Sequence, residues 1–275
     1  MTTDPTPGAQ LTWYNPAGLV TASTDALGNT TVYSYTTASS INTDGSHPPI
    51  NLPYCTIDPV DYQNGVTCPA YGAAHVTGTT TATYDSAGDK LASTNAAGAT
   101  TTSTYYPNSQ VHTTTDPDGT LTTYTYNAAG QAILQTQSSA GYSATTQSAY
   151  DSVGQLYCTV SAANYATGVR CPASPTSPSS PPTGVTSTFY DATGQQTQQT
   201  GPTGATTISA YDDSGNAFCA VSANNYANGI RCPATPPTTH PPLPPAVIST
   251  SVPLSLPITL SANKSKRPAP SAASP

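Results

Sequence analysis

The sequence predicts an all-β fold in which antiparallel β-hairpins repeat along the chain. A Tyr-[Asp/Asn]-x-x-Gly motif recurs, and short Thr- and Tyr-rich segments lie between its copies. The 28 Pro and 20 Gly leave no run of helix formers at helical spacing, so no long helix is expected. Only 7% of the residues are charged, so hydroxyl and amide side chains must face water. Thr-rich strands suit that surface better than helices.

Residues 79–100 contain one complete repeat unit, which is predicted as strand, turn, strand, turn. The first turn runs from Asp85 to Gly88 after Tyr84, and the second runs from Asn95 to Gly98. A short Asp or Asn side chain at the first turn position accepts a hydrogen bond from the backbone two residues later. The Gly three residues later supplies the positive φ that closes a type I turn with a G1 bulge. The spacing between the two turns leaves about six residues of strand, a typical length.

The unit recurs from residue 11 to residue 232, between a flexible N-terminus (1–10) and a Pro/Ser/Ala-rich tail (233–275) that we expect to be disordered. A degenerate copy begins at Tyr106 (YPNSQ), and the pair Tyr124 and Tyr126 predicts rings on one strand face, as part of an aromatic ladder. A single hairpin is marginal in water, so the units should pair edge to edge. The predicted repeat-turn residues are Tyr14, Gly18, Tyr84, Asp85, Gly88, Tyr126, Gly130, Tyr150, Asp151, Gly154, Tyr190, Asp191, Gly194, Tyr211, Asp212 and Gly215.

Three segments, here called cassettes, interrupt the array at 54–69, 157–172 and 218–233. Each has a Cys-x12-Cys-Pro pattern and replaces the second turn with a protruding loop. The identical spacing favours a disulfide within each cassette over reduced thiols or an incomplete zinc site. Such a disulfide contributes about 3 kcal/mol and indicates a location outside the cytosol. The predicted pairs are Cys55–Cys68, Cys158–Cys171 and Cys219–Cys232.

The motif YDSAGDKLASTNAAGATTTSTY (84–105) resembles the YD-repeat, or Rhs-repeat, family, and the resemblance covers roughly residues 11–232. In that family the hairpins wind into a spiralling β-sheet shell. Members include bacterial Rhs polymorphic toxins, wall-associated proteins, the cocoon of insecticidal toxin complexes and animal teneurins. The resemblance implies two partners, the remaining repeats of a larger shell and an enclosed toxin domain. No Rhs core with self-cleaving aspartates and no toxin domain is recognisable, so an array that stops mid-unit is expected to be a fragment.

No catalytic, cofactor or metal site is predicted. The four His (47, 75, 112 and 240) lack local metal or triad partners, and the turn aspartates are explained by their turn position. Six basic residues against a net charge of −7 exclude a phosphate-binding patch and hence a nucleic-acid partner. Tyr62, Tyr165 and Tyr226 project from the cassettes, where they could form a carbohydrate-binding platform or pack back over the disulfide loops.

The sequence therefore predicts a non-enzymatic structural scaffold, a section of a YD/Rhs-type β-shell from an exported bacterial protein. The alternative is a cell-surface adhesin or carbohydrate-binding module. No membrane span or export signal occurs in this stretch, and the disulfides predict an extracellular or cell-surface location.

Overall fold

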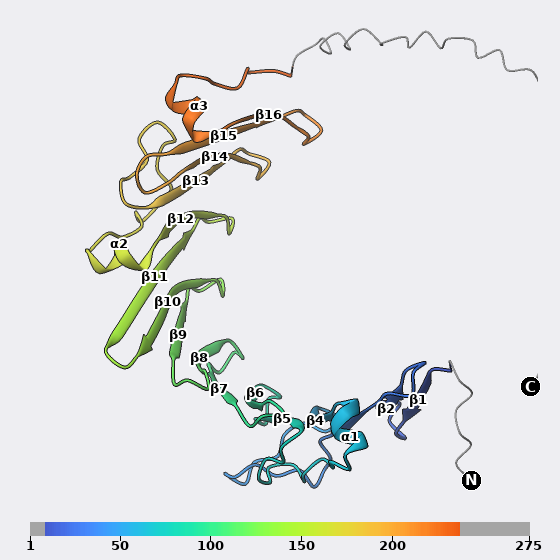
Figure 1. Cartoon of the computed structure of the whole chain (residues 1–275). Helices are drawn as coiled ribbons and strands as arrows, with labels where there is room; N and C mark the ends of the chain where they lie inside the picture. The colour runs from blue at the N-terminus through green and yellow to red at the C-terminus, as the bar shows by residue number, and fades with distance from the viewer. Residues whose placement is uncertain (1–8, 237–275) are drawn as a thin grey trace, which may run out of the picture. The chain divides into compact units, whose positions relative to one another are not determined.

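The computed structural model describes residues 9–236, so most of the predicted tail lies outside the described residues. This region contains a single sheet of sixteen strands, in which sequential neighbours pair antiparallel (Figure 1). The fold prediction of repeated β-hairpins is confirmed, whereas the winding of the sheet into a spiral stays a prediction. The strands are β1 (Leu11–Tyr14), β2 (Val20–Thr24), β3 (Thr30–Tyr35), β4 (Pro53–Ile57), β5 (Thr79–Tyr84), β6 (Lys90–Thr94), β7 (Thr100–Tyr105), β8 (Val111–Thr115), β9 (Leu121–Tyr126), β10 (Ala132–Ser139), β11 (Tyr142–Tyr150), β12 (Leu156–Val160), β13 (Thr186–Tyr190), β14 (Gln196–Thr200), β15 (Thr206–Tyr211) and β16 (Ala217–Val221).

The hairpin between β5 and β6 shows how the turn residues act. The Asp85 N–H donates to the Asp89 carbonyl at 2.9 Å, and the Gly88 N–H donates to the Asp85 carbonyl at 3.2 Å. Gly88 has a φ of 95°, which favours a residue without Cβ. The Asp85 carboxylate also accepts the N–H groups of Ala87 and Asp89. These contacts are those of the predicted type I turn with a G1 bulge.

The degenerate turn begins one residue earlier in the repeat than predicted. Tyr105, not Tyr106, ends strand β7 and pairs with Val111. Tyr106 therefore stands at the first turn position, where other copies have Asp or Asn, and its N–H donates to the Gln110 carbonyl at 2.8 Å. Ser109 takes the place of the turn glycine with a φ of 63°. Two adjacent tyrosines made the motif ambiguous, and the strand register decides between them.

Each cassette contains a short helix, which corrects the prediction of a simple protruding loop. The helices are α1 (Pro59–Gln63), α2 (Ala162–Ala166) and α3 (Ala223–Ala227). Asp58 caps α1 by accepting the N–H groups of Val60 and Asp61, and Ser161 caps α2. The helices contact strands β3, β11 and β15 respectively, so each cassette folds back over the sheet.

The main cluster of buried apolar side chains lies beneath the second cassette. Tyr157, Cys158, Val160 and Val185 form it, and Tyr165 and Val169 pack against it. Elsewhere the sheet buries threonines such as Thr79 and Thr200. Within residues 9–236 no helix is long and apolar enough to cross a membrane. Large apolar packing is therefore concentrated where a cassette covers the sheet.

Candidate functional site

Six strand-end tyrosines connect their hairpin to the hairpin before it. The Tyr126 hydroxyl donates to the carbonyl of Val111 at 2.9 Å. Val111 is the first residue of β8, the second strand of the preceding hairpin. This hydroxyl contact was not predicted from sequence, although a spacing of 15 residues recurs in several of the pairs. The other tyrosines that make it are Tyr35 (to Val20), Tyr84 (to Pro53), Tyr105 (to Lys90), Tyr190 (to Leu156) and Tyr211 (to Gln196).

Glutamines form a second connection between successive turns. Gln110 donates its side-chain amide to the Gly130 carbonyl at 2.8 Å, and Gln131 donates to the Gly154 carbonyl at 2.9 Å. A Cβ on Gly130 would lie only 3.0 Å from the Gln110 amide nitrogen. The turn glycine thus supplies the positive φ and also leaves room for the Gln110 amide beside it.

The predicted aromatic pair lies on one strand face. The rings of Tyr124 and Tyr126 stack with centroids 6.5 Å apart. Tyr106 adds to this group, because its ring centroid lies 4.5 Å from that of His112 and 6.0 Å from that of Tyr126. The aromatic packing is therefore densest around strands β8 and β9.

The turn carboxylates are engaged within their own turns. The Thr193 hydroxyl, followed by the Gln195 N–H, holds the pKa of Asp191 below its usual value. The backbone N–H of Asn216 lowers the pKa of Asp212 in the same way. Carboxylates stabilised as anions by local hydrogen bonds are poor general acids or bases near neutral pH.

Grooves lie between the turns of successive hairpins, at the ends of the strands. One has a volume of about 480 Å³ and is lined by Tyr106, Asn108, Gln110, Tyr126 and their neighbours. An equivalent groove of about 460 Å³ is lined by Asp191, Gln195, Tyr211, Asp212 and Asp213. The same repeat position therefore produces a neutral, aromatic groove at Tyr106 and an acidic groove at Asp191.

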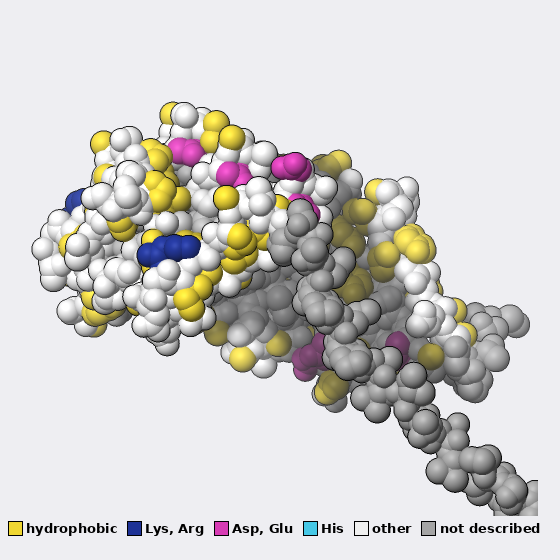
Figure 2. Space-filling model, turned by 90° about the horizontal axis from the view of Figure 1, so that it is seen from above, with side chains coloured by type: hydrophobic (Ala, Val, Ile, Leu, Met, Phe, Trp, Pro, Cys, Tyr) yellow, Lys and Arg dark blue, Asp and Glu magenta, His cyan; other side chains and the backbone are white. Residues whose placement is uncertain are grey.

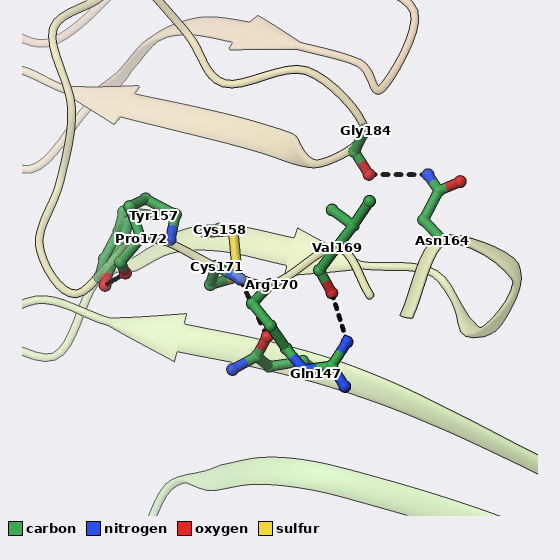
Figure 3. The surroundings of a disulfide bond; sticks show 9 residues. All are labelled: Gln147, Tyr157, Cys158, Asn164, Val169, Arg170, Cys171, Pro172 and Gly184. Carbon is green, nitrogen blue, oxygen red and sulfur yellow. Dashed lines mark hydrogen bonds between the residues drawn. A yellow bond between two sulfur atoms is a disulfide. The ribbon is translucent and has the colours of Figure 1, made fainter. Parts of the chain in front are cut away.

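The cysteines pair within each cassette, as predicted, with Cα–Cα distances of 6.0, 5.8 and 5.8 Å. Figure 3 shows the contacts around the second disulfide. The Tyr157 hydroxyl donates to the Pro172 carbonyl at 2.6 Å, and the Cys171 N–H donates to the Gln147 side chain at 2.9 Å. The Asn164 amide donates to the Gly184 carbonyl at 2.7 Å, which ties the cassette helix to the chain entering the next strand.

The three cassette tyrosines have different surroundings. The Arg170 guanidinium lies 3.4 Å from the centroid of Tyr165, and Arg231 lies 3.6 Å from the centroid of Tyr226, so one face of each ring is covered. Tyr62 has Thr67 at the equivalent position of the first cassette and is 46% exposed. Among the three, Tyr62 has the geometry of an open platform.

The histidines make separate local contacts. His75 hydrogen-bonds the Thr79 carbonyl, and His47 hydrogen-bonds the Ser40 carbonyl. The His112 ring packs at a tilt against Tyr106, while His240 lies outside the described residues. In the part of the chain that the structure describes, no three His, Cys or acidic side chains gather as metal ligands would. Figure 2 shows a largely uncharged face on which the basic side chains stand apart.

No protein-family model and no curated protein sequence matches the chain. Solved structures of Tc toxin chains are similar at low identity. A TcdB2-TccC3 chain without the hypervariable C-terminal region is 15% identical with a TM-score of 0.45, and the match covers 78% of this chain and 11% of that one. TcdB2-TccC3-TEV is 14% identical with a TM-score of 0.42, covering 77% and 12%. A Photorhabdus luminescens Tc holotoxin pore chain is 13% identical with a TM-score of 0.35, covering 78% and 15%. This chain thus spans a small part of the length of each.

Proposed function

We propose that the chain is a non-enzymatic structural scaffold, a section of β-sheet wall of YD/Rhs-repeat type. The observation that carries the proposal is the repeated connection between hairpins. The same tyrosine hydroxyl contact recurs from β3 to β15, and it uses the most abundant aromatic side chain to hold register. The turn carboxylates are likewise engaged in turn geometry. A repeat whose polar side chains hold its own backbone is suited to building a continuous surface.

The finer role follows the family resemblance of the repeat motif. We propose that the wall belongs to an exported bacterial protein of polymorphic-toxin or wall-associated type. Its partners are then further repeats of the same shell and an enclosed toxin domain. The three disulfides support an oxidising location, either extracellular or at the cell surface.

The test is to sequence the source locus across both ends of this reading frame and to express the complete product. Further Tyr-Asp-x-x-Gly hairpins and a distinct C-terminal segment that resists protease inside the intact protein would support the shell. A product without further hairpins, or with a C-terminal segment cleaved as fast as the isolated segment, would contradict it.

A carbohydrate-binding module is the second candidate, favoured by the exposed ring of Tyr62 and by the neutral groove at Tyr106. A glycan screen of the full chain tests it. Tyr62→Ala and Tyr106→Asp should each remove binding at one location, and the second change restores the residue type that other repeats carry. Tyr226→Ala, where Arg231 covers the ring, is the control variant. Glycan binding that none of these variants alters would rule out both locations.

A further inference from the structure

The strand that follows a cassette completes the burial of that cassette. After the first cassette, β5 pairs with β4 with Thr81 opposite Cys55, and after the second, β13 pairs with β12 with Ser187 opposite Cys158. Cys55 and Cys158 are 2% and 1% exposed. The strand that follows the cassette thus covers one side of the disulfide in the first and in the second cassette.

The third cassette has no such strand among residues 9–236. β16 pairs with β15 only, at the end of the described sheet. Cys219 is only half-buried, unlike the corresponding Cys55 and Cys158. Ile230 is 49% exposed, whereas its equivalent, Val169, packs against the buried cluster that contains Val185. The third cassette is therefore built like the others, but no strand of residues 9–236 covers it.

At the opposite end of the sheet, β1 has the sequence features of a strand that covers a cassette. Gly78 and Gly184 each stand six residues before the strand-end tyrosines Tyr84 and Tyr190, and Gly8 stands at the same distance before Tyr14. β1 pairs only with β2 within the described sheet. Trp13 is 46% exposed, Tyr14 is 62% exposed, and the Tyr14 hydroxyl has no hydrogen-bond partner among the described residues.

We propose that β1 of one copy of this chain pairs antiparallel with β16 of a second copy, so that copies associate head to tail. The register of the two internal junctions places Leu11 opposite Cys219. The Tyr14 hydroxyl then reaches the Ala217 carbonyl, as Tyr84 reaches Pro53 and Tyr190 reaches Leu156. The new junction is a continuation of contacts that the chain already uses between its own hairpins.

The edges themselves favour this pairing. β1 (LTWY) and β16 (AFCAV) contain no charged residue and no proline, the usual devices that keep edge strands apart. The contact joins two different surfaces, so one copy can use both ends and growth can continue. Self-association of this kind goes beyond the scaffold role and does not depend on an enclosed toxin. It uses the same two edges that further repeats of a longer shell would occupy, so it is tested on the 275-residue chain by itself.

Sedimentation velocity of the oxidised full chain over the micromolar range tests the proposal. We expect the wild-type chain to grow into larger species as concentration rises. Asn15 donates its N–H to Leu19 inside the hairpin, and N–H groups alternate in direction along a strand, so the Thr12 N–H faces away from β2. Thr12→Pro removes that outward donor and should leave a monomer, whereas the control Thr12→Ala should associate normally.

Two variants with opposite blocked ends make the test specific. Ile230→Lys places a charge where the incoming strand would pack, so it should also be monomeric alone. A mixture of Thr12→Pro and Ile230→Lys retains one intact end on each copy and should form a dimer and nothing larger. This dimer also shows that both variants are folded. Tyr14→Phe should weaken wild-type association by about fivefold through the lost hydrogen bond.

A wild-type chain that sediments as a monomer at every concentration would overturn the proposal, because β1 or β16 would then be covered within one copy or would not pair. Wild-type growth that Thr12→Pro leaves unchanged, or a mixture of the two variants that stays monomeric, would overturn the assigned strand pairing.

Discussion

Replacing Gly130 with Ala should cost more than replacing an equally strained glycine that has open space around it. Gly130 has a φ of 81°, and a Cβ there would lie 3.0 Å from the Gln110 amide nitrogen. The positive φ costs about 1 kcal/mol for a residue with a Cβ. Displacing the Gln110 amide also breaks its hydrogen bond to the Gly130 carbonyl, which adds about 0.5–1 kcal/mol. We therefore expect Gly130→Ala to destabilise its hairpin by about 1.5–2 kcal/mol.

Gly119→Ala is the matched control. Gly119 has a φ of 85°, but a Cβ there would meet nothing within 4 Å. Gly119→Ala should therefore destabilise its hairpin only by the strain of the positive φ, about 1 kcal/mol. In a Gln110→Ala background, the cost of Gly130→Ala should fall to the same value, because the amide that it displaces is gone.

Hydrogen exchange of the turn amides measures these costs locally, which matters because long repeat arrays do not unfold in one step. The free energy of opening is compared for the turns that contain Gly119 and Gly130. Equal costs for the two substitutions would refute the reasoning. So would a difference between them that survives in the Gln110→Ala background.

Three further predictions concern the tyrosine hydroxyl contact, the turn carboxylates and the cassette disulfides. Tyr126→Phe loses the hydroxyl contact to Val111 and should lower the opening free energy of β8 and β9 by about 1 kcal/mol. Tyr150→Phe should change the opening free energy of β11 and β12 little, because no such bond of the Tyr150 hydroxyl occurs within residues 9–236; equal effects in hydrogen exchange would contradict the hydroxyl contact. Hydrogen bonds lower the pKa values of Asp191 and Asp212 in the folded chain. These two carboxylates therefore stabilise the fold above their unfolded pKa of about 4, and this stabilisation is lost as the pH falls below that value. A thermal unfolding temperature that does not change across that pH range would argue against it. Unreduced protein should show no reactive thiol in a thiol titration. Reduction should destabilise the second cassette by about 3 kcal/mol, and amide hydrogen exchange in that cassette that is unchanged after reduction would exclude this effect.

The hairpin turns were predictable because each depends on residues within one short segment. Asp85 bonds its own turn, and Gly88 adopts a φ that other residues avoid, so the motif and the geometry coincide. The disulfide pairs were predictable for a related reason, since one spacing occurs three times. The short helices were missed although Asp58 and Ser161 stand as capping residues before them. A single helical turn between a cysteine and a glycine has too few residues to show a periodic pattern.

The class of fold, the repeat unit, the turn residues and the disulfide pairs could be predicted from the sequence, because all of these are encoded by local spacing. The three-dimensional structure was needed to show that Tyr105 rather than Tyr106 ends its strand, and that tyrosine hydroxyls and Gln110 connect one hairpin to the next. It also decided that arginines cover Tyr165 and Tyr226 but not Tyr62. The contacts between hairpins depend on strand register, which a motif read along the chain does not contain. The arginine contacts depend on how each cassette loop folds back on its own helix.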